Sequence, residues 1–393
     1  MSRSLIFKDR SKLSPYFIPE KLPHRDAQIK RLMSIYGETI DSIGSVYPRV
    51  TQILGNSGSG KTSTTIKFGE LITKKAREEG IDFSFAYVNC KVDGTTRYVL
   101  YGNLLKKVVP AFATRSLSPE EMLHQLADYL KREIKFLLIA FDEIDYFIKM
   151  NPKEHIIYDL TRMPEMYPGQ SFPIIGLIFI SRSLDWHQKL EPGEKSTLGI
   201  GAIEFPKYTS SQIRDILELR AKDAFRPGAV DDDVLNLVSD ITAKPPVNGD
   251  ARVGLDLLFY SGNLAENQGT GRILPDHVRK VFSETNPTIT TEDLISLDEN
   301  SRMILLALVR SLQLSGSAYV GLRDVRESYN LVCEEFNNKP VGDFEERVQD
   351  LVFRGIVDMK SLTELGVSGA SSVDVEKFLS SLMNRLRQGL DEK

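Results

Sequence analysis

The stretch Gly55-Asn56-Ser57-Gly58-Ser59-Gly60-Lys61-Thr62 decides the fold of this chain. It fits the pattern G-x-x-x-x-G-K-[ST] in full, follows the short apolar run Val50–Leu54 and opens a segment, Lys61–Glu79, with helical periodicity. Glycines let the main chain wrap closely around phosphates, and N–H groups at a helix N-terminus supply positive potential. The motif therefore predicts a phosphate-binding loop, and a chance turn before a core helix is the less favoured interpretation.

Some positions of this loop have specific predicted tasks. Lys61 is expected to reach the β- and γ-phosphates of ATP or ADP, which also makes it a candidate catalytic residue. The Thr62 hydroxyl is expected to hold Mg²⁺. The nucleotide-binding set that the motif predicts is Gly55, Asn56, Ser57, Gly58, Ser59, Gly60, Lys61, Thr62 and Ser63.

A second motif places two carboxylates at the end of an apolar run. Phe136–Phe141 is followed directly by Asp142 and Glu143. Asp142 is predicted to bind Mg²⁺, mainly through water, and Glu143 is predicted to polarise the attacking water as a catalytic base. Alone, such a pair would more often be a solvated strand end, but the phosphate loop upstream favours the catalytic interpretation. Asp145, close by, is expected to be solvated or to make a structural hydrogen bond.

The strand that enters the loop is one of five apolar segments that alternate with helical ones. Residues 1–23 before them are polar and interrupted by prolines, which predicts an extended arm, and a helix is expected over Arg25–Ile43. Two helical segments, Arg97–Val109 and one that starts with a capping box at Ser118, lie between the second and third strands, so one helix is extra. The alternation implies a parallel sheet with helices on both faces. The predicted strands are Val50–Leu54, Phe83–Val88, Phe136–Phe141, Ile174–Ile180 and Ile200–Phe205.

The strand signal ends at Pro206, and two further units are predicted. The first is all-helical, with segments Ser210–Phe225, Asp231–Ala243, Asp250–Asn267 and Pro275–Glu284. The second has the winged-helix pattern of three helices followed by a hairpin. Its predicted segments are the helices Ser301–Leu314, Leu322–Phe336 and Asp343–Arg354, the hairpin strands Ile356–Met359 and Ser372–Val375, and the helix Val375–Gln388.

These patterns define the predicted domains. An α/β nucleotide-binding base is expected over residues 1–207, an all-α lid over residues 208–288 and a winged-helix domain over residues 291–393. Within the winged helix, Asp343 with Glu346 forms a capping-box pattern, and Gly355 is placed to end the same helix.

Composition narrows the classes of protein. The 393 residues are 41% hydrophobic and 26% charged, with a formal net charge of −4. The longest apolar runs are too short to span a bilayer, and the N-terminal residues lack the apolar core of a secretory signal. Cys90 and Cys333 lie in different predicted domains, so no disulfide framework is expected. We therefore expect a cytoplasmic protein without a membrane partner, whose contacts with nucleic acid would need local basic patches.

Taken together, these motifs resemble the archaeal origin-recognition and replication-initiator AAA+ ATPases. The resemblance extends over nearly the whole chain, and the phosphate loop and the carboxylate pair occur in the family's order. The extra helix matches the family's initiator-specific insertion. The other segments that carry the resemblance are Pro19–Arg25, Tyr87–Cys90, Tyr208–Ala221 and Gly249–Arg252.

The resemblance implies additional nucleotide contacts. His24 and Arg25 belong to the family's N-terminal motif, which packs around adenine, although either could instead cap the following helix. Tyr208 opens the family's lid segment. Arg252 resembles the second sensor, an arginine that reaches phosphate from the lid, and is therefore the third catalytic candidate. Its alternative interpretation is an exposed lid arginine.

Two departures from the family concern hydrolysis. Arg182 occupies the place of the usual first-sensor asparagine after the fourth strand, where Ser181 could substitute. The segment Leu190–Lys195 lacks the usual arginine finger, and Lys195 offers a point charge rather than a planar fork. Because an arginine finger contributes several orders of magnitude to phosphoryl transfer, we expect good nucleotide binding and slow hydrolysis.

The predicted winged helix is one candidate for DNA contact. Its second helix-turn-helix segment would enter the major groove and present Arg347, Gln349 and Arg354, with a wing near Leu365–Ser372. However, residues 291–393 contain 12 Lys/Arg and 18 Asp/Glu. Since phosphate neutralisation drives affinity for duplex DNA, weak binding is expected, and a protein-binding winged helix is the alternative.

The inserted helix is the other candidate for DNA contact. It and the loop after it carry Lys106, Lys107 and Arg115. In the resembling family this insertion touches DNA and helps to deform it. An ordinary solvated helix face is an equally good interpretation of two adjacent lysines.

The sequence thus predicts an ATP-dependent DNA-replication initiation protein that acts as a nucleotide switch, associated with the nucleoid in the cytoplasm. Its expected partners are double-stranded origin DNA, a replicative helicase during loading and related initiator paralogues. Two alternatives stay open: a signalling-type P-loop ATPase whose winged helix makes protein contacts, and a paralogous regulator that barely hydrolyses ATP.

Overall fold

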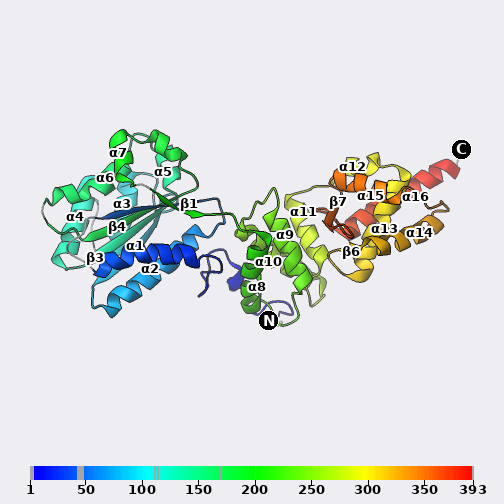
Figure 1. The fold of residues 1–393 in the computed structure, drawn as a ribbon, viewed down its shortest axis with the longest axis horizontal. Helices are drawn as coiled ribbons and strands as arrows, with labels where there is room; N and C mark the ends of the chain where they lie inside the picture. Colours follow the sequence, from blue (N-terminus) through cyan, green and yellow to red (C-terminus); the bar gives the residue numbers. More distant parts are fainter. Residues whose placement is uncertain are drawn as a thin grey trace. The chain divides into compact units, whose positions relative to one another are not determined.

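The computed structural model describes residues 4–41, 48–109, 112, 115–168, 170–199 and 201–391, and it contains two compact units (Figure 1). The base unit consists of residues 18–212 together with 248–251. The lid–wing unit consists of the residues up to 17, residues 213–247 and residues 252 to the C-terminal end. The predicted lid and the predicted winged-helix domain thus lie for the most part in one compact unit. Among the described residues, no helix has the length and apolar character needed to cross a membrane.

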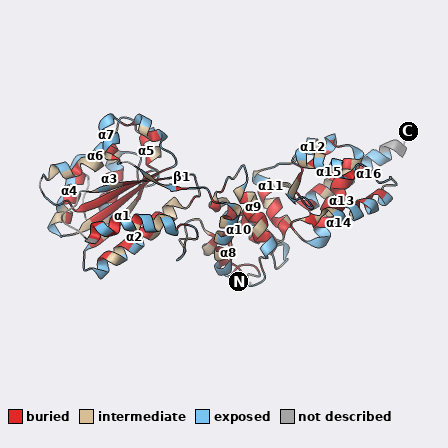
Figure 2. Cartoon of the chain, viewed as in Figure 1, coloured by how far each residue is buried: buried red, intermediate tan, exposed pale blue. Residues whose placement is uncertain are grey.

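The base unit contains the predicted parallel sheet. Its strand order is β2-β3-β4-β1-β5, and all four neighbouring pairs are parallel. The central strand β4 is buried at every position, and Figure 2 shows much of the sheet in the colour of buried residues. Ile200, where the fifth strand was expected to begin, lies outside the described residues. The strands are β1 (Arg49–Gly55), β2 (Phe83–Asn89), β3 (Phe136–Asp142), β4 (Ile174–Ser181) and β5 (Ala202–Phe205).

Helices cover both faces of this sheet because successive side chains of a strand point to opposite faces. In β3, Leu138 and Ala140 pack in a core with helices α1 and α2. Leu137 and Ile139 pack in another core with helices α3 to α6. The sequence did not predict α5 and α6, and residues 42 and 43 of the first predicted helix lie outside the described residues. The helices are α1 (Asp26–Asp41), α2 (Lys61–Glu78), α3 (Arg97–Val108), α4 (Pro119–Arg132), α5 (Ile144–Met150), α6 (Ile156–Arg162) and α7 (Pro192–Thr197).

The lid helices follow the predicted pattern, whereas the N-terminal residues differ from the expected extended arm. Residues 4–17 include a short 3₁₀ helix and pack in the lid–wing unit. Ile6 and Leu13 are almost completely buried, and the Phe7 ring stacks on Phe225 with ring centres 5.1 Å apart. Burial of these apolar side chains explains why the arm is held on the lid. The lid helices are α8 (Ser210–Ala224), α9 (Asp232–Ala243), α10 (Ala251–Gln268) and α11 (Pro275–Thr285).

The C-terminal part has the three helices and the hairpin of a winged helix, but the hairpin differs from the prediction. Strand β7 (Val357–Ser361) pairs with β8 (Glu364–Val367), so the wing turns at residues 362–363. Ser372–Val375, the predicted second strand, instead begins α16 (Ser372–Asp391). Because only two residues separate β7 from β8, the tight local pairing replaces the wider one. The remaining elements are α12 (Thr291–Ser296), α13 (Glu299–Ser315), β6 (Val320–Gly321), α14 (Leu322–Glu335) and α15 (Phe344–Phe353).

Buried polar contacts join the lid helices to the winged helix. Arg279 of α11 is 2% exposed, and its guanidinium donates to the main-chain oxygens of Val367 and Ala318. Asp276, on the same helix, accepts the Ser372 N–H at 2.6 Å and so caps the N-terminus of α16. These contacts explain why the two predicted domains form one compact unit.

Candidate functional site: a nucleotide pocket and charged surfaces

The phosphate loop lies at the carboxyl edge of the sheet, where open α/β sheets bind ligands. It connects the end of β1 to the start of α2, as predicted. Gly58 and Gly60 have positive φ angles, 65° and 84°, which glycine adopts without steric cost. Lys61 bends over the loop and donates from Nζ to the oxygens of Gly55, at 2.6 Å, and Asn56, at 2.9 Å. The loop therefore surrounds the positive charge that phosphate oxygens would meet.

Asp142 and Thr62 meet at this edge, as the two motifs predict. The Thr62 hydroxyl donates to the Asp142 carboxylate at 2.6 Å, and Asp142 is 4% exposed. The Tyr87 hydroxyl donates to the same carboxylate oxygen at 2.8 Å. Burial, followed by the Asp142 charge, raises the pKa of Tyr87 well above its ordinary value, so this tyrosine acts as a donor. Sequence reasoning missed Tyr87, because the motif marked it only as part of a strand.

The carboxylate and the hydroxyl suit a magnesium ion that keeps most of its other ligands as phosphate and water oxygens. Among the described residues, no group of three or more His, Cys, Asp and Glu side chains could enclose a metal. Thr62 and Asp142 are the residues that would hold a magnesium ion at this edge.

Glu143 and Asp145 follow Asp142 in the chain. Glu143 has a φ of 55°, a left-handed conformation that is uncommon outside glycine and that concentrates at functional sites. Its N–H donates to the Asp142 carboxylate at 2.8 Å, which fixes the direction of the turn. Asp145 accepts the Arg182 N–H at 3.3 Å, which confirms the structural role expected for it.

The two predicted residues of the N-terminal motif differ in burial: Arg25 is buried and His24 is exposed. Arg25 is 2% exposed and donates to three main-chain oxygens, those of Ser59, Pro206 and His24, each at 2.9 Å. Its guanidinium lies 3.9 Å from the centre of the Tyr208 ring. His24 is exposed and has a φ of 62°. The structure therefore brings Arg25 and Tyr208 against the phosphate loop, with the arginine facing carbonyl oxygens.

The segment expected to contain the second sensor lies partly in each unit. Residues 248–251 belong to the base unit, where the Ala251 N–H approaches the Gly58 oxygen at 3.4 Å. A side chain at Gly58 would collide with Asp250, so this glycine is needed for the close approach. Arg252 belongs to the lid–wing unit and lies exposed on the first turn of α10. Its role as a phosphate sensor stays a prediction.

The expected first-sensor position and the finger segment have other local contacts. Ser181 is 2% exposed; its hydroxyl accepts the Trp186 indole N–H at 3.1 Å and donates to the Ser183 oxygen at 3.0 Å. This hydroxyl is thus engaged within the loop that follows β4. Lys195 lies exposed on α7, a helix that includes most of the segment Leu190–Lys195.

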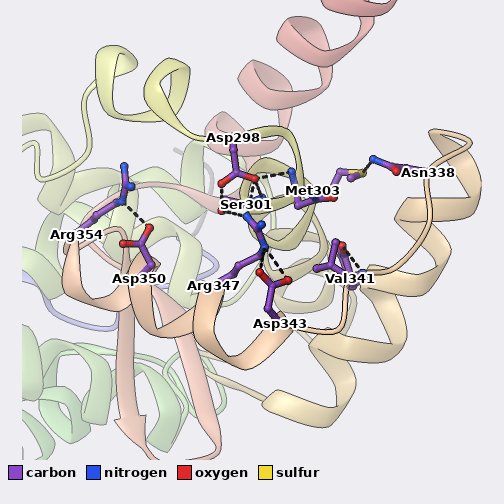
Figure 3. A network of polar contacts seen from close by, with 11 residues as sticks. Asp298, Ser301, Met303, Asn338, Val341, Asp343, Arg347, Asp350 and Arg354 are labelled. Carbon is purple, nitrogen blue, oxygen red and sulfur yellow. Dashed lines mark hydrogen bonds and ion pairs between the residues drawn. The ribbon is translucent and has the colours of Figure 1, made fainter.

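Acidic neighbours pair with both cations predicted for the recognition helix, α15 (Figure 3). Arg347 donates to Asp298 at 2.7 Å and forms an ion pair with Asp343 at 3.0 Å. Arg354 donates to Asp350 at 2.7 Å. The predicted capping box at Asp343 is wrong, since this residue caps no N–H of the described helix and its carboxylate is held by Arg347 instead.

The remaining features of α15 follow the prediction more closely. Gly355, with a φ of 73°, ends the helix as expected. Gln349 is exposed.

The predicted wing, Leu365–Ser372, is wrong in position, because Leu365 and Val367 are buried in β8 while Leu362, at the turn, is 86% exposed.

The three cations predicted for the inserted region, Lys106, Lys107 and Arg115, differ in their contacts. Lys107 is tied to the base by bonds to the Tyr87 oxygen, at 2.9 Å, and to Asp93, at 2.7 Å. Lys106 is exposed on α3, and Arg115 is exposed in the connection to α4. The Ser118 capping box that starts α4 is present as predicted.

A parallel sheet with a phosphate loop, a strand-end carboxylate pair and a helical lid defines the class of AAA+ ATPase-type proteins. Residues 46–182 match the family model of the AAA domain, and residues 214–283 match that of the Cdc6 AAA+ ATPase-type lid domain. The chain is 30% identical over 393 residues to the ORC1-type DNA replication protein 2 of Sulfurisphaera tokodaii, covering 97% of this chain and 93% of that protein.

Solved structures agree with this assignment. Cdc6p from Pyrobaculum aerophilum superposes with a TM-score of 0.79 at 29% identity, covering 97% of this chain and 99% of that one. The Aeropyrum pernix ORC1 protein in complex with DNA gives 0.62 at 27% identity, covering 97% and 98%. The chain belongs to the ORC1/Cdc6-type family of archaeal DNA replication proteins.

Proposed function

We propose that this chain binds ATP and Mg²⁺ and acts as a slow nucleotide switch in the recognition of origin DNA or the loading of a helicase. The observation that carries the nucleotide part is the meeting of the phosphate loop with Thr62 and Asp142 at one sheet edge, with a 2.6 Å bond between the two side chains. Glu143, next in the chain, would polarise the attacking water. The family membership supports the role in replication.

The mechanism follows from the groups present. Main-chain N–H groups of the loop and Lys61 would bind the β- and γ-phosphates, and Mg²⁺ at Thr62 and Asp142 would neutralise charge that develops during phosphoryl transfer. Asp142, held by Thr62 and Tyr87, is already in one orientation. Arg252 would report occupancy of the γ-phosphate from the lid, so that ATP and ADP favour different lid positions.

Two substitutions test the nucleotide part. Lys61→Ala should abolish ATP binding, because it removes the charge that meets the phosphates. Glu143→Ala should retain ATP binding and block hydrolysis, because it removes only the water-polarising group. Titration with ATP and single-turnover hydrolysis measure the two effects. Equal ATP affinity in the Lys61 variant would contradict the assignment of the site.

The DNA part rests on the named relative that was solved with DNA and on the exposed cations of the inserted region. We assign the principal phosphate contacts to Lys106 and Arg115, since Arg347 and Arg354 are paired with carboxylates. Footprinting on candidate origin DNA with ATP, with ADP and without nucleotide tests this part. Loss of protection in a Lys106→Ala/Arg115→Ala variant supports the assignment, and unchanged protection contradicts it.

Because the α15 arginines are paired with carboxylates, a second candidate function is favoured for the winged helix: it contacts a protein and not DNA. This candidate predicts that duplex DNA binding has no contribution from Arg347, Gln349 or Arg354. Replacing each by alanine and measuring the salt dependence of DNA binding separates the two roles. A loss of affinity with a shallower salt slope would show that these side chains contact phosphate.

A further inference from the structure

Arg25 is a buried cation directed at protein. All three nitrogens of its guanidinium donate to main-chain oxygens, and its face is covered by the Tyr208 ring at 3.9 Å. Burial lowers the pKa of Arg25, but an arginine stays charged in proteins. A charged, buried guanidinium is costly unless its hydrogen bonds are satisfied, and here carbonyl oxygens satisfy them. The resemblance placed this arginine near adenine, whereas the contacts point to the phosphate loop.

The bond from Arg25 to Ser59 has a consequence for the next N–H group. A trans peptide unit carries its C=O and its N–H on opposite sides. Holding the Ser59 oxygen on Arg25 therefore turns the Gly60 N–H away from Arg25. Gly60 immediately precedes α2, and the first N–H groups of a helix have no acceptor within the helix. The Gly60 N–H is therefore able to donate a hydrogen bond to an oxygen of a bound phosphate.

The same guanidinium also holds the segment that leads from the sheet into the lid. It bonds the Pro206 oxygen and stacks on Tyr208, two residues before α8 begins. The packing is tight, because a Cβ added to Gly60 would lie 2.5 Å from the Tyr208 hydroxyl. One side chain thus fixes both the loop and the residues 206–208.

We propose that Arg25 is a positioning residue that aims the Gly60 N–H at the phosphate chain and couples the loop to residues 206–208. This inference rests on the proposed nucleotide function and names a determinant of phosphate affinity within the same site. Arg25 contributes through Ser59 and Gly60, without touching the base of the nucleotide. Its removal should therefore weaken every ligand that carries the polyphosphate, whether or not adenine is present.

The test compares ATP, ADP and inorganic tripolyphosphate on the full chain, the last by competition against ATP. Arg25→Met should weaken all three by a similar factor, on the order of tenfold or more, because a hydrogen bond from a charged group is lost at the loop. Arg25→Lys should recover part of the loss, since an ammonium can reach one of the three oxygens. The control is Arg31→Met, a change at an exposed arginine of α1, the helix that begins directly after Arg25.

The outcomes separate this inference from the proposed function. If the unaltered chain does not bind ATP, the proposed function fails. If it binds ATP and Arg25→Met weakens ATP and ADP but leaves tripolyphosphate unchanged, Arg25 acts on adenine and the positioning role is wrong. Unchanged affinity for all three ligands would also overturn the positioning role. If Arg25→Met unfolds the chain, its melting temperature falls. Tyr208→Leu, which removes the ring that stacks on Arg25, is then the second variant, and it should weaken ATP, ADP and tripolyphosphate alike.

Discussion

At the residue scale, buried polar side chains give this chain properties that depend on pH, and His277 is one of them. It is 4% exposed; its Nδ1 accepts the Leu274 N–H at 3.0 Å, and its Nε2 lies 2.9 Å from the Gln268 side-chain oxygen. Both contacts suit the neutral imidazole with the proton on Nε2. Burial lowers the pKa of His277 below its ordinary 6.5, only partly opposed by the Asp276 charge.

The sign of the effect on stability follows from linkage. The unfolded chain takes up a proton near pH 6.5, where the native imidazole is still neutral. Stability is therefore complete above 6.5 and falls as the pH drops from 6.5 toward the lowered native pKa, by about 1.4 kcal/mol for each pH unit between the two values. Hydrogen exchange at residues 269–282 should show easier opening at about pH 5 than at about pH 7.5.

His277→Gln should remove most of this pH dependence, since an amide oxygen can accept the Leu274 N–H without titrating. The exposed His124 offers a matched control, and His124→Gln should leave the dependence intact. If the His277 variant keeps the full pH dependence, another group is responsible.

The same scale shows what the sequence could predict of the site. Lys61, Thr62 and Asp142 were found because their spacing along the chain is itself the motif. Tyr87 and the role of Arg25 were missed because their partners are distant in sequence. Only the register of β2 on β3, in which Val88 pairs with Phe141, brings the Tyr87 hydroxyl to Asp142.

At the element scale, α15 is a helix whose cations are occupied by its neighbours. Asp298 and Asp343 hold Arg347, and Asp350 holds Arg354. The carboxylates cancel charge that would otherwise meet DNA phosphates. Neutralising them should therefore create a DNA-binding face. The triple variant Asp298→Asn/Asp343→Asn/Asp350→Asn should bind duplex DNA more tightly, with a salt slope steeper by up to about 2, or about 0.9 for each arginine that gains a phosphate contact.

The control for this prediction changes net charge by the same amount without releasing an arginine. Glu299, Glu334 and Glu346 are exposed acids of α13, α14 and α15, and their joint replacement by Gln meets this condition. Asn at position 298 keeps the N-cap of α13, because Asn caps as well as Asp. Equal gains in the two triple variants would mean that net charge, rather than release of the arginines, sets the affinity.

The bounds of the strands also show which elements the local sequence pattern can predict and which it cannot. The parallel sheet was predictable because its strands are short apolar runs, and the inner ones, such as Ile174–Ser181, are buried on both faces. The hairpin was not predictable, because β8 has only four residues. Gly366 and Gly369 suggested a turn, whereas Gly366 lies within β8 and Gly369 just after it. The pairing of Val357 with Val367 is a tertiary choice that places both side chains in the winged-helix core.

At the scale of the whole molecule, buried polar groups add to the apolar core that holds the lid–wing unit together. Arg279 is 2% exposed, less than the other buried ionisable side chains of this unit, Arg220 and His277, and its acceptors, the oxygens of Val367 and Ala318, both belong to the winged helix. Burial lowers the pKa of Arg279, while the charges of Asp276 and Asp358 and the Tyr319 hydroxyl act in the opposite direction. An exposed ion pair between Lys244 and Asp358, at 3.1 Å, adds little by comparison.

We expect Arg279→Met to loosen the winged helix on the lid while leaving nucleotide binding in the base unit intact. Methionine fills a similar volume but leaves two buried carbonyl oxygens without a donor, at a cost of about 1–3 kcal/mol each. Relief of the buried charge offsets part of this cost, but Asp276 and Asp358 then lose a compensating cation, so the net effect should be destabilising by about 2 kcal/mol. Hydrogen exchange should accelerate in β8 and at the start of α16, with the strands of the base unchanged.

The neighbouring Lys280 separates this effect from a loss of charge alone. It lies on the same helix and pairs with Asp374 at 3.8 Å in a partly exposed setting, so Lys280→Met should change stability by less than about 0.5 kcal/mol. If both variants leave exchange in β8 unchanged, Arg279 does not hold the winged helix. If Arg279→Met accelerates exchange there and also removes the difference between ATP and ADP in DNA footprints, the lid and the winged helix transmit the nucleotide state as one body, because ATP affinity itself is unaltered.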